Sequence, residues 1–375
     1  MNRSLMNISI TGSGPVAMAL TLFLRRQGIA PERLFVAPLA AQVPPAAAAR
    51  AIALSQGSVQ LLNRIIDVPA GAPIEKVDIG VLGHGLHSQL HPGDLGLTAL
   101  GRVVRYQNLW TALQTAFERE QQRCGHRFEA PAQAGDALHI IADGRPDDDA
   151  TRRQFEQVAL TTELQTAMDS HALPLPGVAY ERFKQNGPLA LLPLPEPGRL
   201  SLVWCTTPDH GEQLQQMDAD AFEQALATAL GARFAPITLA DERFVTPLQR
   251  AISGPPRQAG CLRLGNAAQT LHPVAGQGLN LGLRDAFETS AAMASAQEQI
   301  TAPAAMATKI FSLRKTDRTN TVRLTDILAQ LDKQLSWAGV NNGATQSIVI
   351  ALLDTLGPLR RLAARRLIFG HRQAN

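Results

Sequence analysis

Between Cys261 and Asp285 the chain combines the features of a short strand, a glycine-containing loop and a helix, in that order. Cys261–Leu264 is mostly apolar and runs into Gly265, where the missing side chain lets the backbone turn and a ligand approach closely. Three residues then shape an irregular loop, namely Pro273, Gly276 and Gly278. A helical pattern resumes at Leu279–Ala286, and the free amides at such a helix start can face an anion or an electron-rich ring. The segment therefore predicts a ligand-binding loop, with an ordinary structural turn as the alternative.

A second strand, turn and helix are predicted near the N-terminus. Met6–Thr11 is a β-rich run that leads into Gly12 and Gly14, and the apolar helix Met18–Leu24 follows. In the dinucleotide-binding fingerprint the two glycines form the tight turn and let a pyrophosphate reach the helix N-terminus, while a small residue, here Ala17, takes the third position. Such a turn alone is found in many proteins. Its pairing with the distant glycine loop predicts the two halves of one dinucleotide site.

The same fingerprint expects an acidic residue at the end of the next strand, where its carboxylate accepts hydrogen bonds from the adenosine ribose hydroxyls. In this chain the strand Arg33–Val36 ends in Ala37 and Pro38, and the nearest acid, Glu32, precedes the strand. The usual anchor for the ribose is therefore missing.

Residues 265–269 read Gly-Asn-Ala-Ala-Gln. This segment resembles the second flavin motif of the para-hydroxybenzoate-hydroxylase-like flavin monooxygenases, and within them the FAD-dependent ubiquinone-biosynthesis hydroxylases. Most relatives write this motif Gly-Asp-Ala-Ala-His, and the variant found here resembles the 2-polyprenyl-6-methoxyphenol hydroxylase branch. The run from Arg50 to Ser58 also resembles the family, in which the arginine reaches the flavin and the serine-rich turn caps the following helix.

The resemblance implies flavin contacts at the N-terminal turn, at an arginine, at an Asp-Gly pair and in the late loop. The implied cofactor-binding residues are Gly12, Gly14, Ala17, Arg50, Asp143, Gly144, Gly265, Asn266, Gly276, Gly278, Leu279 and Asn280. Asn266 would hydrogen-bond the ribityl-phosphate side in place of the usual aspartate, and His272 and Pro273 would border the flavin ring as the catalytic residues. A solvated surface arginine is the alternative for Arg50, and a structural loop histidine is the alternative for His272. No metal site is expected.

The Asp143-Gly144 pair keeps only the first half of a third motif of the family. In relatives a serine and an arginine follow, and the motif helps to bind both the flavin and the nicotinamide donor. Here residues 145–153 form a charged stretch without the serine. Together with Ala37, this places the departures from the family on the nucleotide side of the predicted site, whereas the ring-side loop is intact.

The function that the resemblance implies is an FAD-dependent aromatic-ring hydroxylase. It would use NAD(P)H and O2 to hydroxylate a polyprenylated phenol in ubiquinone biosynthesis through a flavin hydroperoxide, with the protein excluding water and positioning the ring. The alternative is a degenerate paralogue with weakened or lost FAD binding, acting as a non-catalytic subunit or lipid-binding partner of a ubiquinone-biosynthesis complex. The missing ribose carboxylate motivates it, since losing one charge-assisted hydrogen bond costs about 1.5–3 kcal/mol.

The expected fold class is α/β (α+β). It comprises a Rossmann-like FAD-binding domain, an inserted antiparallel-sheet substrate domain and a helical C-terminal tail. The expected ranges are 1–78, 101–150 and 247–310 for the discontinuous FAD-binding domain, 79–100 and 151–246 for the substrate domain, and 311–375 for the C-terminal helices.

Composition narrows the expected surroundings and partners. The 375 residues carry a net charge of only +3, which is too slight to indicate nucleic-acid binding. Three widely spaced cysteines suggest neither a disulfide framework nor a metal cluster, which fits a reducing cytoplasm.

The C-terminal region contains two apolar stretches, Ile348–Leu353 and Leu356–Phe369, with arginines in and around the second. They predict either a helix that lies on the inner face of a membrane or a helix docked on the flavin domain with solvated arginines. A polyprenylated substrate would favour the peripheral membrane contact. No oligomeric state is predicted.

Overall fold

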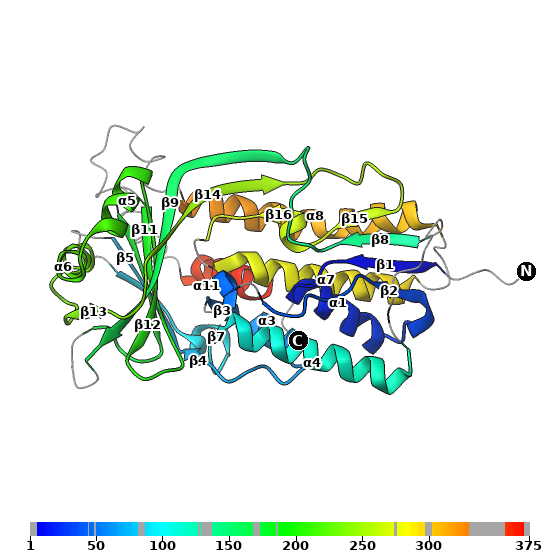
Figure 1. Cartoon of the computed structure of the whole chain (residues 1–375), viewed down its shortest axis with the longest axis horizontal. Helices are drawn as coiled ribbons and strands as arrows, with labels where there is room; N and C mark the ends of the chain where they lie inside the picture. Colours follow the sequence, from blue (N-terminus) through cyan, green and yellow to red (C-terminus); the bar gives the residue numbers. More distant parts are fainter. Residues whose placement is uncertain are drawn as a thin grey trace, which may run out of the picture.

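The computed structural model of the chain has two lobes, which are linked by long β-strands (Figure 1). The described residues are 6–43, 45–48, 50–81, 87–126, 128, 137–167, 173–184, 187–273, 276–296, 302–329 and 357–370.

One lobe is built on a parallel sheet. Its strands in the described residues are β1 (Asn7–Thr11), β2 (Leu34–Val36), β8 (Ala137–Ile141) and β15 (Cys261–Arg263), in the order β15-β8-β1-β2. All three pairings are parallel. The helices of this lobe are α1 (Pro15–Arg26), α4 (Tyr106–Cys124), α7 (Gln277–Ser295) and α8 (Pro303–Ala329). Ile8, Ile10, Leu138 and Ile140 are all fully buried, as expected for parallel strands covered on both faces.

The other lobe is a larger mixed sheet. Its strands are β5 (Lys76–Val81), β6 (His87–Leu90), β9 (Thr151–Thr166), β10 (Val178–Lys184), β11 (Gly187–Pro193), β12 (Arg199–Thr206), β13 (Ile237–Leu239), β14 (Phe244–Ile252) and β16 (Gln269–Thr270). The order is β16-β14-β9-β12-β11-β10-β5-β6, and β13 pairs with β9. The pairing of β5 with β10 is parallel, and the other pairings between the described strands of this sheet are antiparallel. On its outer face the sheet packs against α5 (Pro208–Gln216) and α6 (Ala219–Leu230), which bury Leu214 and Phe222 (Figure 1).

A small antiparallel sheet connects the two lobes. It contains β3 (Ala51–Ser55), β7 (Gly101–Arg105) and β4 (Ala72–Ile74), in the order β3-β7-β4. The remaining short elements are α2 (Pro45–Ala48), α3 (Gln56–Leu62) and the 3-10 turns η1 (Pro31–Arg33), η2 (Pro92–Leu95) and η3 (Gly265–Ala267). Arg105, at the end of β7, forms ion pairs with Glu163 of β9 and Glu196, so this sheet is tied to the larger one by charge as well as by packing.

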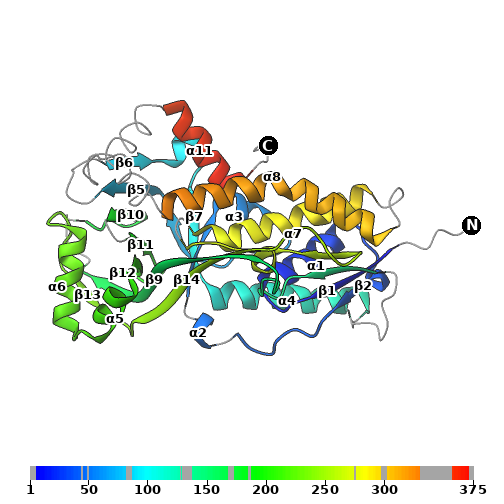
Figure 2. The ribbon, with the colours of Figure 1, turned by 90° about the horizontal axis from the view of Figure 1, so that it is seen from above.

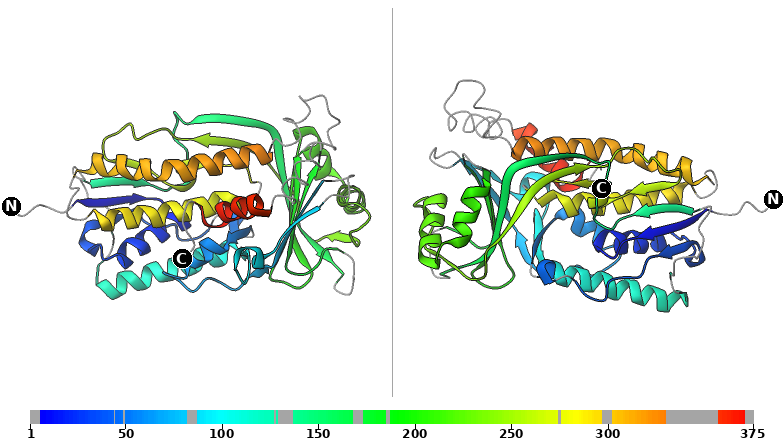
Figure 3. Two further views of the ribbon diagram at one scale, coloured as in Figure 1. Left: turned by 180° about the vertical axis from the view of Figure 1, so that it is seen from behind. Right: turned by 45° about the horizontal axis from the view of Figure 1, so that its top comes forward.

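The C-terminal helices lie against both lobes. Helix α8 runs alongside α7 (Figure 2), and the two views in Figure 3 show the same arrangement. Helix α11 (Gly357–Phe369) packs on α3 and β3, where Ser55 Oγ donates a 2.9 Å hydrogen bond to the carbonyl of Ile368. Ile368 and Phe369 are buried in one apolar cluster with Ala179 of the larger sheet and with Leu194, which follows β11. Of the two predicted alternatives for the C-terminal region, residues 357–370 show a helix docked on the rest of the protein. The other apolar stretch, Ile348–Leu353, lies outside the described residues.

The predicted fold class is confirmed, with one difference: the larger sheet is mixed rather than antiparallel throughout, because β5 and β10 run in the same direction. The predicted domain boundaries stay predictions. The larger sheet begins at Lys76, and β14 continues across residues 246 and 247. None of the described helices is long and apolar enough to cross a membrane.

Candidate functional site

The two predicted glycine turns lie in contact, at the edge of the parallel sheet where β1 ends. Helix α1 packs on α7, and Val16 contacts both the late loop and α7. A Cβ atom at Gly265 would lie 3.1 Å from Val16 Cγ2, and one at Gly282 would lie 2.8 Å from the same atom. The structure therefore brings the two halves of the predicted site together, and small residues at the crossing permit the close approach.

The two glycines of the N-terminal turn do different things. Gly12 has φ +136°, and a Cβ atom there would lie 2.4 Å from the carbonyl oxygen of Ala142 at the end of β8. Gly14 is the N-cap residue of α1 with φ −88°, and a Cβ atom there would meet nothing within 4 Å. Gly12 is thus required by the protein itself, whereas Gly14 leaves room at a helix N-terminus, where an anionic ligand is stabilised.

The close contact at Gly12 also places the Asp-Gly pair beside the turn. Asp143 and Gly144 are exposed and follow directly on Ala142, and Asp143 Oδ1 accepts a 3.0 Å hydrogen bond from the amide of Arg145. At the neighbouring strand end, the amide of Ala37 donates to the carbonyl of Ile10 at 2.9 Å. The carboxyl ends of β1, β2 and β8 therefore meet at this edge, as the sequence predicts for a nucleotide site.

Helix α4 holds the backbone of the turn in place. Trp110 is 5% exposed, and its indole Nε1 donates a 3.1 Å hydrogen bond to the carbonyl of Ser13. Sequence reasoning missed this residue, because a tryptophan on the apolar face of a helix looks like ordinary core. Ala17, the third position of the fingerprint, is fully buried and contributes packing.

The start of α7 is fastened to β3 by Asn280. Its side chain is 1% exposed and accepts a hydrogen bond from the amide of Ser55 at 2.9 Å. It also donates to the carbonyls of Ala53 and Gly276, at 2.9 and 2.8 Å. The polar atoms of the Asn280 side chain are therefore all hydrogen-bonded within the protein. What this helix start can offer to a ligand is the set of unpaired amides in its first turn.

Asn266 and Gly278 lie next to each other across the loop. A Cβ atom at Gly278 would lie 3.6 Å from Asn266 Oδ1, and the Asn266 side chain is exposed. Leu279 is half-buried and packs on the core. Arg50 is exposed and immediately precedes β3, whose Ala53 contacts Gly276. Their roles toward a cofactor stay predictions, and the contacts at the start of α7 are made by Asn266 and Ala53.

His272 lies behind the loop. Its side chain is 1% exposed and packs edge-to-face on Phe155, with ring centroids 5.0 Å apart. Burial lowers the pKa of His272 to about 4, so the ring is neutral at pH 7. Pro273 is half-buried. The catalytic assignment of both residues stays a prediction, and the burial of His272 against Phe155 favours a role in positioning the loop.

The buried histidine predicts a pH dependence of stability. In the unfolded chain His272 titrates near its ordinary pKa of 6.5, and in the folded chain near 4. Its contribution is therefore complete above pH 6.5 and is lost as the pH falls toward 4, by about 3 kcal/mol in total. Urea titrations of the wild type and of His272→Gln at several pH values test this. The variant should lose less stability than the wild type over that window, and parallel curves would contradict the assignment.

Asp285 connects the loop to the core and is a second residue that sequence reasoning did not single out. Its Oδ2 accepts hydrogen bonds from the amide of Gly265 at 3.1 Å and from the side chain of Gln269 at 2.7 Å. Its Oδ1 lies 2.6 Å from the guanidinium of Arg314 in α8. Asp285 therefore holds both sides of η3, and the only signal in the sequence is a charged residue within an apolar helical pattern.

The network extends through α8 to the end of α11. Arg314 also pairs with Glu288 and, at 3.1 Å, with Asp317, while Arg284 Nε lies 2.9 Å from Asp317 Oδ2. Burial would raise the pKa of Asp317, but the two arginines hold it below its ordinary range. Burial would lower the pKa of Arg314, but the three carboxylates raise it. Gly370 packs directly on the Arg284–Asp317 pair, where a Cβ atom would lie 2.6 Å from Arg284 Nε.

Comparison with known proteins gives matches to flavin enzymes. Residues 145–308 match the family described as FAD binding domain. The 3-demethoxyubiquinol 3-hydroxylase of Escherichia coli is 30% identical over 314 residues, which cover 74% of this chain and 77% of that protein. A ubiquinone hydroxylase of Rhodospirillum rubrum is 29% identical over 276 residues, covering 72% of this chain and 63% of that protein, which is less than two thirds of its length. The crystal structure of PqsL from Pseudomonas aeruginosa superposes with a TM-score of 0.69 at 16% identity, covering 89% of this chain and 98% of that one.

Proposed function

The chain belongs to the family of FAD-binding monooxygenases that includes ubiquinone hydroxylases, and from this premise we propose that it hydroxylates the aromatic ring of a polyprenylated phenol in ubiquinone biosynthesis. NAD(P)H is the proposed electron donor. Other ubiquinone-biosynthesis proteins are proposed partners, and peripheral contact with a membrane is proposed because the substrate is a lipid.

The observation that carries the proposal is the contact of the start of α1 with the late loop and with α7 at one edge of the parallel sheet. Gly14 leaves space at the start of α1, and Asn280 fastens the start of α7 to β3. One helix start can face the pyrophosphate of FAD and the other can face its ring. Bound FAD would supply the oxygen-transfer chemistry.

The residues of the chain would bind and orient the cofactor. The amides at Gly14 and at the first turn of α7 would stabilise negative charge, and Asn266 would hydrogen-bond the ribityl-phosphate side. Asp285 would hold the backbone of Gly265 and so keep the loop in its binding shape. The larger sheet would exclude water from the ring side.

A second candidate is the degenerate paralogue that acts as a non-catalytic partner. It is favoured by Ala37, which occupies the strand end where a ribose-binding carboxylate would stand, and by the mostly exposed, serine-free segment after Gly144. The visible absorbance of the purified chain, recorded before and after incubation with excess FAD and desalting, separates the two. Flavin bands that survive desalting support the hydroxylase, and their absence in both samples supports the partner.

Gly278→Asp is expected to weaken FAD binding by at least about a hundredfold, because it adds negative charge where the start of α7 faces the cofactor. The new Cβ atom fits, since its nearest neighbour outside the helix backbone, Asn266 Oδ1, lies 3.6 Å away. An aspartate in the first turn of a helix is also tolerated by the helix itself. Isothermal titration with FAD measures the effect.

Gly278→Asn is the matched control, because it has nearly the same size without the charge. It should retain most of the affinity. Equal losses in the two variants would show that bulk matters rather than charge, and unchanged binding by Gly278→Asp would place the flavin elsewhere.

Ala37→Glu is expected to tighten FAD binding by roughly ten- to a hundredfold, because it restores a carboxylate at the end of β2. Ala37 is half-buried at the strand end, so a longer side chain can extend toward the site. Titration with FAD measures the gain, and Ala37→Gln is the uncharged control. The prediction fails if Ala37→Glu binds FAD no more tightly than the wild type, or if Ala37→Gln shows the same gain.

A further inference from the structure

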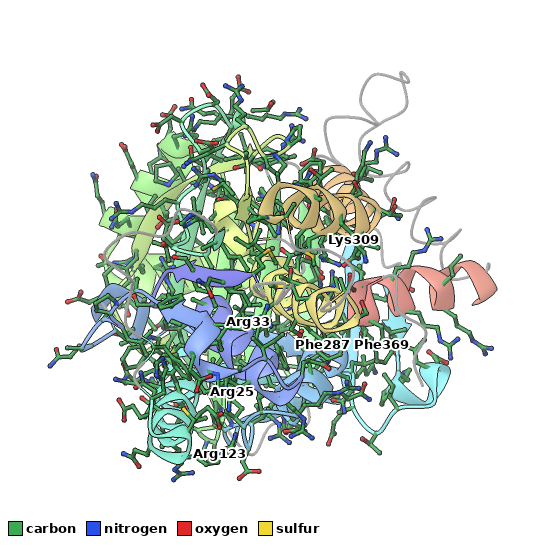
Figure 4. The ribbon with its side chains drawn as sticks, turned by 90° about the vertical axis from the view of Figure 1, so that its right-hand side faces the viewer. Arg25, Arg33, Arg123, Phe287, Lys309 and Phe369 are labelled. Carbon is green, nitrogen blue, oxygen red and sulfur yellow. The ribbon has the colours of Figure 1, made fainter. Side chains whose placement is uncertain are left out.

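A pocket of about 830 Å³ lies between the C-terminal ends of α1 and α4 and the segment after α3. It is separate from the candidate flavin site. Gly14 stands at the start of α1 and Arg26 at its end, and twelve residues of helix span about 18 Å. Two residues that line the pocket, Arg25 of α1 and Arg123 of α4, are labelled in Figure 4, in which this end of the molecule faces the viewer.

The pocket is strongly basic. Five arginines and two carboxylates line it, which leaves a surplus of three positive charges, whereas the whole chain carries only +3. One carboxylate, Glu120, is fully engaged: Arg123 donates to it at 2.8 Å and Arg25 at 2.7 Å. The bond to Arg123, helped by Arg25 and opposed by burial, lowers the pKa of Glu120. Glu120 is therefore ionised and neutralised within the protein.

Three arginines of the pocket remain available. Arg26 and Arg119 are exposed, and in the part of the chain that the structure describes their side chains form no hydrogen bond or ion pair. Arg64 stacks on Phe287, with its guanidinium carbon 4.9 Å from the ring centroid, which holds its charge in one place. Guanidinium groups from three separate segments therefore converge on one space, as they do where proteins bind phosphate.

The floor of the pocket is apolar. Leu22 and Ile66 are buried there, and Ile65, Ala112 and Ala116 contribute further apolar surface. A simple hydrated anion would gain nothing from such a floor, whereas a molecule with an anionic group joined to an apolar part would use both features.

We propose that this pocket binds a phosphate group joined to an apolar part, with Arg26, Arg64 and Arg119 as its charged contacts. A phospholipid head group has this chemistry, and so does a soluble phosphate ester that carries a hydrocarbon. The proposal does not depend on the proposed hydroxylase function, because it uses no residue of the flavin site.

The full-length protein is tested by co-sedimentation with vesicles of phosphatidylcholine that do or do not contain phosphatidylglycerol. Calorimetric titrations use hexyl phosphate, glycerol phosphate and short-chain phosphatidylglycerol. The variant is Arg26→Glu/Arg119→Glu, in which both residues are exposed and unpaired, so that folding should be unaffected. The wild type should bind the phosphatidylglycerol probes, and the variant should bind them at least about tenfold more weakly.

The matched control is Lys315→Glu/Arg323→Glu, which changes the net charge equally at two exposed positions of α8. A phospholipid ligand is supported if the wild type and the control bind the vesicles or the short-chain lipid and the pocket variant does not. Binding of hexyl phosphate but not of vesicles, with the same loss in the pocket variant, supports a soluble phosphate ester as the ligand. Binding of glycerol phosphate as tight as that of hexyl phosphate would show that the apolar floor takes no part and would overturn the proposal. Equal losses in both variants, or no binding of any probe by the wild type, would overturn the proposal. FAD titration of the same variants should give wild-type affinity, which separates this test from that of the flavin site.

Discussion

Arg314→Met should lower the free energy of unfolding by about 3–5 kcal/mol, the largest effect that we expect from a single polar substitution in this chain. Arg314 is 4% exposed and pairs with Asp285, Glu288 and Asp317. Removing it leaves Asp285 and Asp317, both buried, with fewer compensating charges. Because Asp285 also holds the amide of Gly265, the loop at the candidate flavin site should loosen at the same time.

Urea unfolding followed by circular dichroism measures this loss. Arg323→Met is the control, since Arg323 is exposed on the same helix and its replacement should change stability by no more than about 0.5 kcal/mol. Adding Asp285→Asn to Arg314→Met should recover part of the loss, because the two residues share one network. A cost below about 1 kcal/mol for Arg314→Met would mean that water or rearrangement compensates the buried carboxylates.

Gly12→Ala and Gly14→Ala should separate folding from binding within one turn. The alanine at residue 12 would combine a φ of +136° with a Cβ atom 2.4 Å from the backbone oxygen of Ala142, so we expect a loss of about 3 kcal/mol or more. The alanine at residue 14 would meet no protein atom within 4 Å at an ordinary φ of −88°. It should leave the melting temperature nearly unchanged while obstructing a pyrophosphate at the start of α1.

Thermal unfolding without ligand and titration with FAD give the two readouts. The expected pattern is a large fall in melting temperature for Gly12→Ala, and a fall in FAD affinity of at least about tenfold for Gly14→Ala with little change in melting temperature. If Gly14→Ala binds FAD as the wild type does, the pyrophosphate does not lie at this helix start. If Gly12→Ala is stable, the end of β8 can move away from the turn.

The sequence was sufficient for the two turns and for the class of fold. Glycines between an apolar strand and an apolar helix limit the local backbone to few conformations, and the dinucleotide fingerprint together with the resemblance to flavin monooxygenases implies the class of fold. The turn at Gly12 and the loop at Gly265 could therefore be recognised separately. That they lie in contact follows from the rule that carboxyl ends of parallel strands share one edge of the sheet.

The sequence could not assign the side chains that support the site. Asn280 is expected at the cofactor through its backbone amide, which stays a prediction; its side chain fastens α7 to β3, because Ala53 and Ser55 present a carbonyl and an amide to it. His272 is expected at the ring, which stays a prediction; its side chain is buried on Phe155, a contact that the sequence does not indicate. Neither partner is near in sequence, so no local pattern reveals the contact.

Local sequence thus determined the elements that need particular backbone shapes: the glycine turns, the helices that follow them, and the absence of a carboxylate at Ala37. Tertiary structure alone decided which charges are buried together around Arg314, which arginines remain free around the pocket of α1 and α4, and which faces of the C-terminal helices are covered. The physical reason is the distance along the chain between the interacting groups. Backbone conformation is limited by steric contacts between neighbouring residues, whereas the charge and burial of a side chain depend on groups that folding brings from distant parts of the chain.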